Sequence, residues 1–290
     1  MSTMEIDMTT RPASDAIRQA ITRVSAERIR RDLFYLCRDP LPCRTAAYTR
    51  PGQTQNTLAE ADAFVRSRLA EAGYAVAVTS HRVQSYRCDP ARPLHHWYAP
   101  PDPSDPFFDV SNIEAFRPGR THPGDIVQTV SHKDSMSWID SPGAHDNAAG
   151  TVVSIELARI LAACGMRRSL RLLFCNEEHT PWTSRAAAAA AAARGDRILA
   201  VLNIDSLDGK SDEDMAAGRL LHAIGYSKEE GRALAAFMRD CASRYDIKLD
   251  VTLFPKQPAN DDDGVFIQAG FTRTVANLGS YPYADSQYHL

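Results

Sequence analysis

The stretch Ser141–Gly150, SPGAHDNAAG, places one acidic side chain, Asp146, between turn residues and the start of an apolar helix. Pro142 and Gly143 favour a tight turn before it. Apolar residues then recur at three- and four-residue spacing from 153 to 164, which predicts a helix that ends near Gly165. The pattern therefore predicts a carboxylate fixed at a sharp corner directly before a buried helix.

Segments on both sides of this corner alternate between strand and helix patterns. Strands are predicted at 74–83, 111–119, 125–132, 169–174, 198–204 and 247–254, and helices over most of 13–38 and at 57–72, 186–193 and 227–245. The last and the 57–72 helices begin with capping-box patterns, at Thr57 and Ser227. This order predicts an α/β fold, a three-layer α/β/α sandwich around a mixed, mainly parallel sheet.

No linker divides the chain, so we expect one domain over residues 1–290. Residues 1–56 are expected to form a helical N-terminal extension. Residues 88–109 are rich in proline and are expected to form a surface insertion that carries His95 and His96. Exposed loop histidines are the default interpretation of these two residues, and a lid over the active site is the alternative.

Composition and charge narrow the class of partner. The 290 residues are 44% hydrophobic, and 33 basic residues nearly balance 36 acidic ones. No basic block is interleaved with aromatic residues, so we expect no nucleic-acid partner and instead a peptide or small amide substrate. The sequence shows no secretory signal and no long apolar run, which predicts a cytoplasmic protein without a membrane partner. The six cysteines form no CxxC pair and are expected to be reduced.

Acidic and imidazole side chains follow the predicted strands, where open α/β sheets place their sites. They are His132, Asp134, Asp146, Glu177, Glu178, Asp205 and His289. Each alone has an ordinary explanation, because a Glu-Glu pair is usually a solvated turn and a lone histidine is usually a core residue. So many carboxylates at one edge would repel each other unless cations held them. The ligands suit zinc, with cobalt or manganese as alternatives, and outnumber what one tetrahedral ion uses. Two ions bridged by Asp146 would use them all.

The segments SHKDS, PGAHDNAAG, CNEE, LNIDSLDG and YHL, in this order, resemble metallopeptidase family 28, the di-zinc aminopeptidases related to glutaminyl cyclases. The resemblance runs from about Thr57 to the C-terminus. It implies that His132 and Asp205 hold one zinc, that Glu178 and His289 hold the other, and that Asp146 bridges them. It also implies a cis peptide bond between Asp146 and Asn147.

The resemblance implies roles for the remaining residues as well. Glu177 is expected to be the general base of a metal-assisted hydrolysis, in which two zinc ions about 3.5–4 Å apart share a water. Asp134 is expected to orient His132. His145 and His179 match no ligand position and are expected to be bystanders or pocket-lining residues.

Substrate contacts are expected from Asp263 and Tyr281. Relatives usually have a histidine where this chain has Asp263. The acidic run Asp261 to Asp263 fits two interpretations equally, a solvated turn or a negative pocket wall that attracts a substrate amine.

Three functions remain in competition. The favoured one is a di-zinc exopeptidase that hydrolyses N-terminal residues from short peptides. The second is a glutaminyl-cyclase-like acyltransferase working with one zinc, which the presence of both His132 and Asp205 disfavours. The third is a non-catalytic binding protein of the same fold, which Glu177 disfavours. Metallopeptidase family 20 uses a similar set of metal ligands, but the short spacing of 14 positions between His132 and Asp146 disfavours that family.

Overall fold

The computed structural model describes residues 13–92, 97–138 and 141–289. His95 and His96 lie outside the described residues, so the interpretations of these two histidines stay predictions. The division into one domain with an extension and an insertion also stays a prediction.

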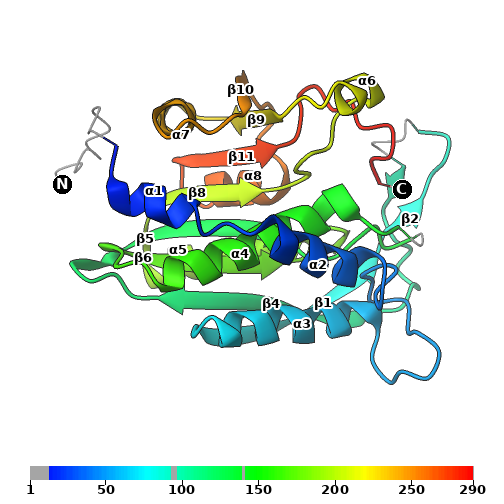
Figure 1. Ribbon diagram of the computed structural model, residues 1–290. Helices are drawn as coiled ribbons and strands as arrows, with labels where there is room; N and C mark the ends of the chain where they lie inside the picture. Colours follow the sequence, from blue (N-terminus) through cyan, green and yellow to red (C-terminus); the bar gives the residue numbers. More distant parts are fainter. Residues whose placement is uncertain (1–12, 93–96, 139–140, 290) are drawn as a thin grey trace.

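A nine-stranded mixed sheet forms the centre of the molecule, in the order β10-β9-β11-β8-β5-β6-β4-β1-β7 (Figure 1). Strands β6, β5, β8 and β11 run parallel at its middle, and antiparallel pairs β4–β6 and β9–β11 extend it on both sides. The strands are β1 (Ala75–Ser85), β4 (Phe108–Arg117), β5 (His122–His132), β6 (Arg168–Cys175), β7 (His179–Thr180), β8 (Arg197–Ile204), β9 (Leu221–Tyr226), β10 (Asp250–Pro255) and β11 (Thr274–Leu278).

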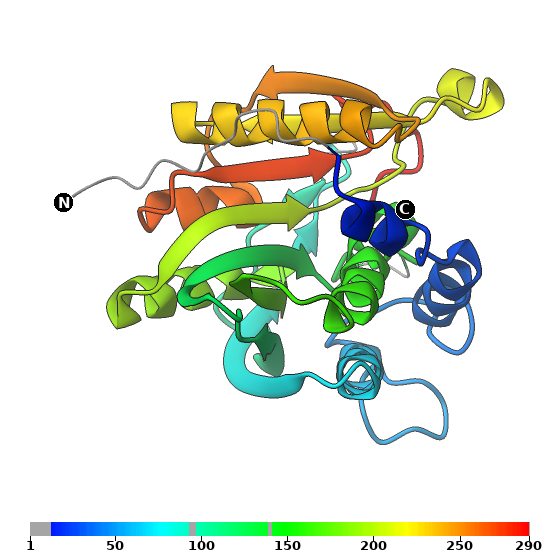
Figure 2. The ribbon, with the colours of Figure 1, turned by 60° about the vertical axis from the view of Figure 1, so that its left-hand side comes forward.

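Helices cover both faces of this sheet, as Figures 1 and 2 show from two directions. Strand β6 explains the layering, because its residues alternate between two cores. Leu172 and Phe174 pack against α2 (Ala26–Cys37), α3 (Thr57–Glu71) and α4 (Gly150–Ala162). Leu173 packs on the opposite face against α5 (Thr183–Arg194) and α8 (Asp261–Gln268). The structure therefore confirms the expected α/β/α sandwich.

The N-terminal helical segment is two helices rather than one. Helix α1 (Asp15–Ile21) ends before α2 begins, because the Ser25 side chain caps α2 by accepting a hydrogen bond from the Arg28 N–H. The Ser25 N–H is used by Glu156 of α4, at 2.9 Å. The two helices together confirm the expectation of helix over most of 13–38, with an interruption before this cap.

Both capping-box predictions were wrong in detail. Asn56, not Thr57, caps α3, and the Thr57 hydroxyl donates to the Thr45 carbonyl oxygen instead. Helix α7 (Glu229–Arg244) starts after Lys228, and the Ser227 hydroxyl donates to the Lys256 carbonyl oxygen. In both places the hydroxyl expected to cap the helix donates instead to a backbone carbonyl oxygen of another segment.

Several short elements carry no clear sequence pattern. They are β2 (Arg87–Cys88) and β3 (Tyr98–Ala99) inside the proline-rich segment, α6 (Asp212–Ala216), β9, β11, α8 and the π-helix η2 (Ala144–Ala149). Strand β11 is buried throughout, so it lacks the alternation that marks a half-exposed strand. Helix α8 begins with three aspartates, so its first turn has the sequence of a polar loop although most of the helix is buried.

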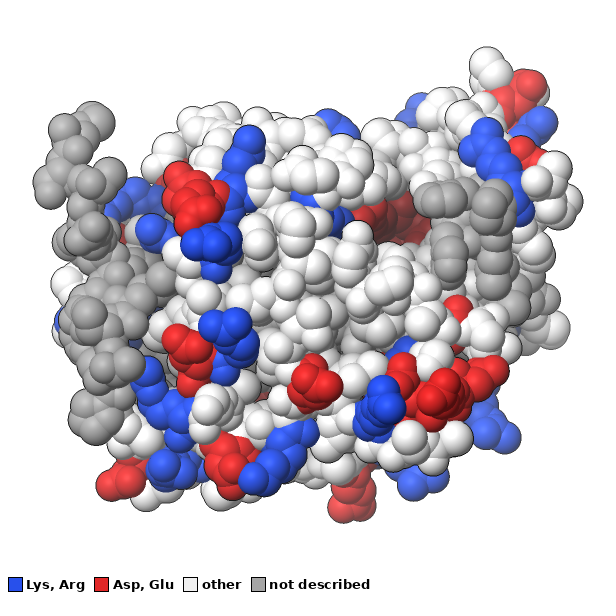
Figure 3. All heavy atoms as spheres, turned by 90° about the horizontal axis from the view of Figure 1, so that it is seen from above, with Lys and Arg blue, Asp and Glu red and all other residues white. Residues whose placement is uncertain are grey.

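Within the described ranges, none of the helices combines the length and the apolar character that a membrane crossing demands. On the face seen in Figure 3, acidic and basic side chains of the described residues are interspersed around a broad uncharged area.

Candidate metal centre

Three adjacent parallel strands bring the candidate residues together. His132 is the last residue of β5, Glu177 and Glu178 follow β6 after Asn176, and Asp205 follows β8. Because β5 lies between β6 and β8, their carboxyl ends open at one edge of the sheet. Asp146 reaches this edge from η2, and His289 reaches it from the C-terminal segment.

The distances place Asp146 between two histidines. Its Oδ1 lies 2.9 Å from His132 Nε2, and its Oδ2 lies 3.2 Å from His289 Nε2. Asp205 Oδ1 lies 3.3 Å from His132 Nε2, and Glu178 Oε1 lies 3.9 Å from His289 Nε2. The two oxygens of one carboxylate thus face two separate sets of side chains.

Two groups of three residues bring possible ligand atoms within 4.8 Å of one another. One group is His132, Asp146 and Glu178, and the other is His132, Glu177 and Asp205. Glu177, expected as a base, therefore lies at ligand distance. The two ligand sets implied by the sequence differ from these groups, because they place Glu178 with His289 rather than with His132.

The corner that carries Asp146 is shaped by its neighbours. The Asp146–Asn147 peptide bond is cis, as the resemblance implied. The Asn147 side chain donates to the Ile204 carbonyl oxygen at the end of β8 and accepts from the Gly150 N–H. A Cβ on Gly150 would lie 2.3 Å from the Ile204 carbonyl oxygen, so only glycine lets the start of α4 approach β8 this closely.

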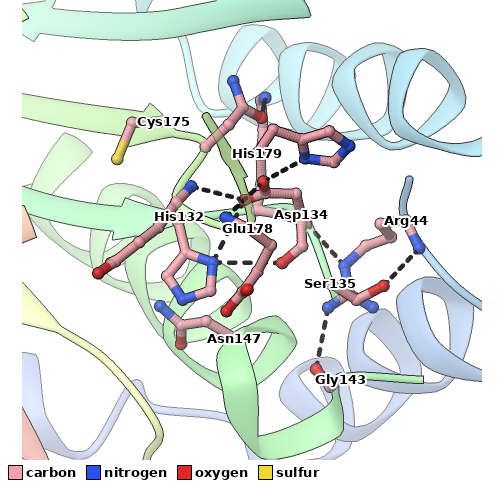
Figure 4. A network of polar contacts seen from close by, with 12 residues as sticks. Arg44, His132, Asp134, Ser135, Gly143, Asn147, Cys175, Glu178 and His179 are labelled. Carbon is pink, nitrogen blue, oxygen red and sulfur yellow. Dashed lines mark hydrogen bonds and ion pairs between the residues drawn. The ribbon is translucent and has the colours of Figure 1, made fainter. Parts of the chain in front are cut away.

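Asp134 connects four groups behind the centre (Figure 4). Its Oδ1 lies 3.3 Å from His132 Nδ1 and accepts the Glu177 N–H. Its Oδ2 accepts the Glu178 N–H and lies 2.8 Å from His179 Nδ1. His179 Nε2 accepts the N–H of Ala46, so its Nδ1 carries the proton donated to Asp134.

His179 was therefore misjudged as a bystander. It is fully buried and holds the same carboxylate that contacts His132. Its direct succession to Glu177 and Glu178 was the sequence signal available, but only the fold shows which way the ring points. His145, the other presumed bystander, contacts Asp285 Oδ2 at 2.7 Å.

The histidines and the aspartates of the centre polarise one another. Burial alone lowers the pKa of His132, but Asp205, Asp134 and Asp146 outweigh burial and hold this pKa well above its ordinary value. Burial alone raises the pKa of Asp146, but its contacts with His132 and His289 hold this pKa below the ordinary range. In the protein without a cation, the Asp146 carboxylate is stabilised by imidazolium.

The two glutamates behave in the opposite way. Loss of water contact raises the pKa of Glu177 well above its ordinary value, and Asp262 and Asp261 raise it further. Burial and then Asp146 raise the pKa of Glu178. His132 lowers the pKa of both glutamates, but burial and the nearby carboxylates outweigh it, so a bound cation would favour their ionised forms.

Unused polar atoms fit a cation as well. Asp146 Oδ1, Glu177 Oε2 and His289 Nδ1 are buried and have no hydrogen-bond partner among the described residues. Asp146 Oδ1 is close to His132 Nε2 without hydrogen-bond geometry. Two ligand atoms on one tetrahedral zinc lie about 3.3 Å apart, so lone pairs converging on a common ion match this contact.

A cavity of about 330 Å³ opens onto the centre. Tyr281, expected as a substrate contact, lines it together with Asn260 and Asp261. Its remaining wall is largely aromatic, with Tyr86, Tyr98, Trp182, Tyr283 and Tyr288. The structure thus places an apolar, aromatic wall opposite a cluster of charged groups.

Asp263 does not reach this cavity, which corrects its assignment as a substrate contact. It is buried at the start of α8, where its carboxylate pairs with Lys256. Burial raises the pKa of Asp262 and of Asp263 to about 6, so the solvated-turn interpretation was wrong for both. Asp261 alone of the three lines the cavity.

Solved structures share this fold. The LapA aminopeptidase of Legionella pneumophila aligns with a TM-score of 0.66 at 13% identity, over 99% of this chain and 74% of that one. A glutaminyl cyclase of Porphyromonas gingivalis aligns with a TM-score of 0.60 at 13% identity, over 93% of this chain and 88% of that one. The architecture and the cluster at its sheet edge define an α/β protein of the zinc-exopeptidase fold class.

A curated relative and a family model narrow this class. A probable zinc metalloprotease of Pyrenophora teres f. teres is 27% identical over 168 residues, which cover 56% of this chain and 32% of the relative. The chain thus spans about a third of the length of that relative. The model of peptidase family M28 matches residues 112–290, and the chain belongs to this family.

Proposed function

We propose that this chain is a di-zinc exopeptidase that hydrolyses N-terminal residues from short peptides. The observation that carries the proposal is the position of Asp146, whose two carboxylate oxygens face His132 and His289 separately. Membership of a peptidase family and the aminopeptidase among its structural neighbours support the reaction class. Zinc is supported by the mixed imidazole and carboxylate donors, which cobalt or manganese also accept.

In this proposal, His132 and Asp205 would hold one ion, Glu178 and His289 would hold the other, and Asp146 would contribute to both. When bound, the metal would supply Lewis acidity and lower the pKa of a water toward neutrality. Asp134 keeps the His132 ring oriented through Nδ1, so that Nε2 faces the centre.

Glu177 takes the proton from the attacking water and passes it to the leaving amine. It lies half-buried at the cavity wall with a free Oε2, and its backbone N–H is fixed by Asp134. The aromatic residues around the cavity limit the water that reaches the reacting groups. Asp261, which lines the cavity and pairs with Lys256 at 2.8 Å, offers a carboxylate to a substrate amine.

Glu177→Gln tests the proposal. Hydrolysis of aminoacyl-anilides and dipeptides should fall by at least about a thousandfold, because the amide cannot accept the proton. Zinc content should stay at two per chain, measured by elemental analysis. Glu230→Gln, on exposed α7, serves as the matched control and should keep full activity. Loss of zinc in Glu177→Gln would show that Glu177 is a metal ligand, and full activity would show that it is not the general base.

A second function has a specific observation in its favour. The glutaminyl cyclase among the structural neighbours shares the fold over most of both chains. An acyltransferase of this kind would work with one zinc and convert an N-terminal glutamine into a cyclic amide. One zinc per chain together with cyclisation of a glutaminyl peptide, and without anilide hydrolysis, would favour this second function.

A further inference from the structure

Arg44 is a fully buried side chain that lies outside the family-matched range 112–290. It belongs to the segment 1–56 that the sequence predicts to be an extension of the domain. Burying a charged group is costly unless hydrogen bonds satisfy it. The partners of Arg44 therefore show which backbone segments the buried guanidinium holds in place.

Its guanidinium donates to four backbone carbonyl oxygens from three segments. Nε donates to Lys133 at 2.7 Å, and Nη1 donates to Leu36 at 2.8 Å and to Pro142 at 2.6 Å. Nη2 donates to Gly143 at 2.9 Å. The planar fork of an arginine suits this task, because it directs donors to several sides at once.

Two of these segments carry candidate ligands. Lys133 directly follows His132, and Pro142 and Gly143 lead into the corner that holds Asp146. One guanidinium thus joins the backbone beside His132 to the backbone beside Asp146. The contact between these two side chains, 2.9 Å, is shorter than those of Asp146 with His289, Asp205 with His132 and Glu178 with His289.

The surroundings leave Arg44 little freedom. Its N–H donates to the Ser135 hydroxyl, and its carbonyl oxygen accepts the Ser135 N–H (Figure 4). Gly143 has a φ of +52°, and a Cβ there would lie 2.8 Å from Arg44 Nη2. Only a glycine at 143 allows the guanidinium to lie against this turn.

We propose that Arg44 is a positioning residue that sets the separation of His132 and Asp146 and thereby completes the metal centre. This inference rests on the proposed function. Its prediction concerns metal affinity, because Arg44 acts through the backbone that carries the ligands and touches neither substrate nor metal.

The test measures zinc affinity by competition with a chromophoric chelator in the full chain. Arg44→Lys keeps the charge but loses the fork, and Arg44→Met loses both. Both should weaken zinc binding about ten- to a hundredfold, the range for partners that orient ligands. Both should also change the visible absorption spectrum of the cobalt-substituted protein, which reports ligand geometry.

Arg171→Met is the matched control. Arg171 is also a buried arginine, but it pairs with Asp196 just before β8, at the end of that strand opposite to Asp205. It should lower stability and leave zinc affinity and the cobalt spectrum unchanged. Wild-type affinity and spectrum in both Arg44 variants would overturn the inference.

A second variant decides the question if neither Arg44 variant folds. Ser135→Ala keeps the guanidinium and removes only the hydroxyl that accepts the Arg44 N–H. It should weaken zinc binding severalfold, and unchanged affinity would overturn the inference. Absence of zinc binding by the wild-type chain would instead overturn the proposed function, and the inference with it.

Discussion

Single residues decide the charge state of this centre. Asp134 and Asp146 are buried carboxylates whose pKa is lowered by contacts with histidines. Burial and nearby carboxylates raise the pKa values of the neighbouring Glu177 and Glu178, and they outweigh the opposite effect of His132. The environments therefore favour the ionised form of the two aspartates and the protonated form of the two glutamates, until a cation binds.

His179 provides a prediction at this scale. His179→Phe should lower the free energy of unfolding by about 2–3 kcal/mol, because Asp134 Oδ2 loses one of its two donors in a buried site. His179→Gln keeps an N–H donor and should lose less. Denaturant unfolding of the chelated protein measures both. His81→Phe, at a partly exposed position of β1, is the control, and equal stability of all three variants would show that the His179 contact contributes nothing.

Among elements, α4 joins the corner to the core. Ile155 lies at the middle of this helix, is fully buried, and packs in the cluster formed with α2, α3 and β6. Ile155→Ala should lower the free energy of unfolding by about 2–5 kcal/mol through lost burial and a cavity. Val78→Ala on β1, where the side chain is 44% exposed, should change it by less than about 1 kcal/mol. Similar losses in both variants would contradict this assignment of the core.

Helix α2 is attached to α4 through charge. The Glu156 carboxylate accepts from the Ser25 N–H at 2.9 Å and from Arg28 Nε at 3.0 Å. Burial alone raises the pKa of Glu156, but these bonds outweigh it and hold the pKa below its ordinary value. The native state therefore binds fewer protons than the unfolded state around that value.

The pH dependence follows from this sign. The contribution of Glu156 is fully present above its unfolded pKa, near 4.5, and is lost as pH falls through the lower folded pKa. Glu156→Gln should lower stability by about 1–2 kcal/mol at pH 7 and by less at pH 3. Unfolding curves at both pH values measure this difference. A loss of equal size at both would show that the interaction does not depend on ionisation.

For the whole molecule, metal removal is the decisive perturbation. The centre joins ends of β5, β6 and β8 with the corner and the C-terminal segment, so cations should stabilise the complete fold. Each zinc at a hundred times its Kd should add about 2.7 kcal/mol. Chelation should lower Tm and abolish hydrolysis, and zinc should restore both, whereas magnesium, which prefers oxygen ligands, should not. An unchanged Tm and unchanged activity after chelation would remove the metal centre.

The sequence by itself determined the sheet-and-helix alternation, the family and the candidate ligands, because strand ends, apolar runs and acidic motifs are local signals. The alanine run of helix α5 and the apolar run of strand β6 are examples of such local signals. The cytoplasmic location, the domain limits and the absence of nucleic-acid partners stay predictions.

Tertiary structure alone decided which of these residues meet. The caps moved from Thr57 to Asn56 and from Ser227 to Lys228 because distant carbonyls took the hydroxyls. Asp263 and Asp261 both pair with Lys256, but only Asp261 of the two lines the cavity. The contact of His179 with Asp134 spans 45 positions, and those of Arg44 with Lys133, Pro142 and Gly143 span 89 to 99. Local sequence patterns do not encode such contacts, because they exist only once packing fixes the direction of each side chain.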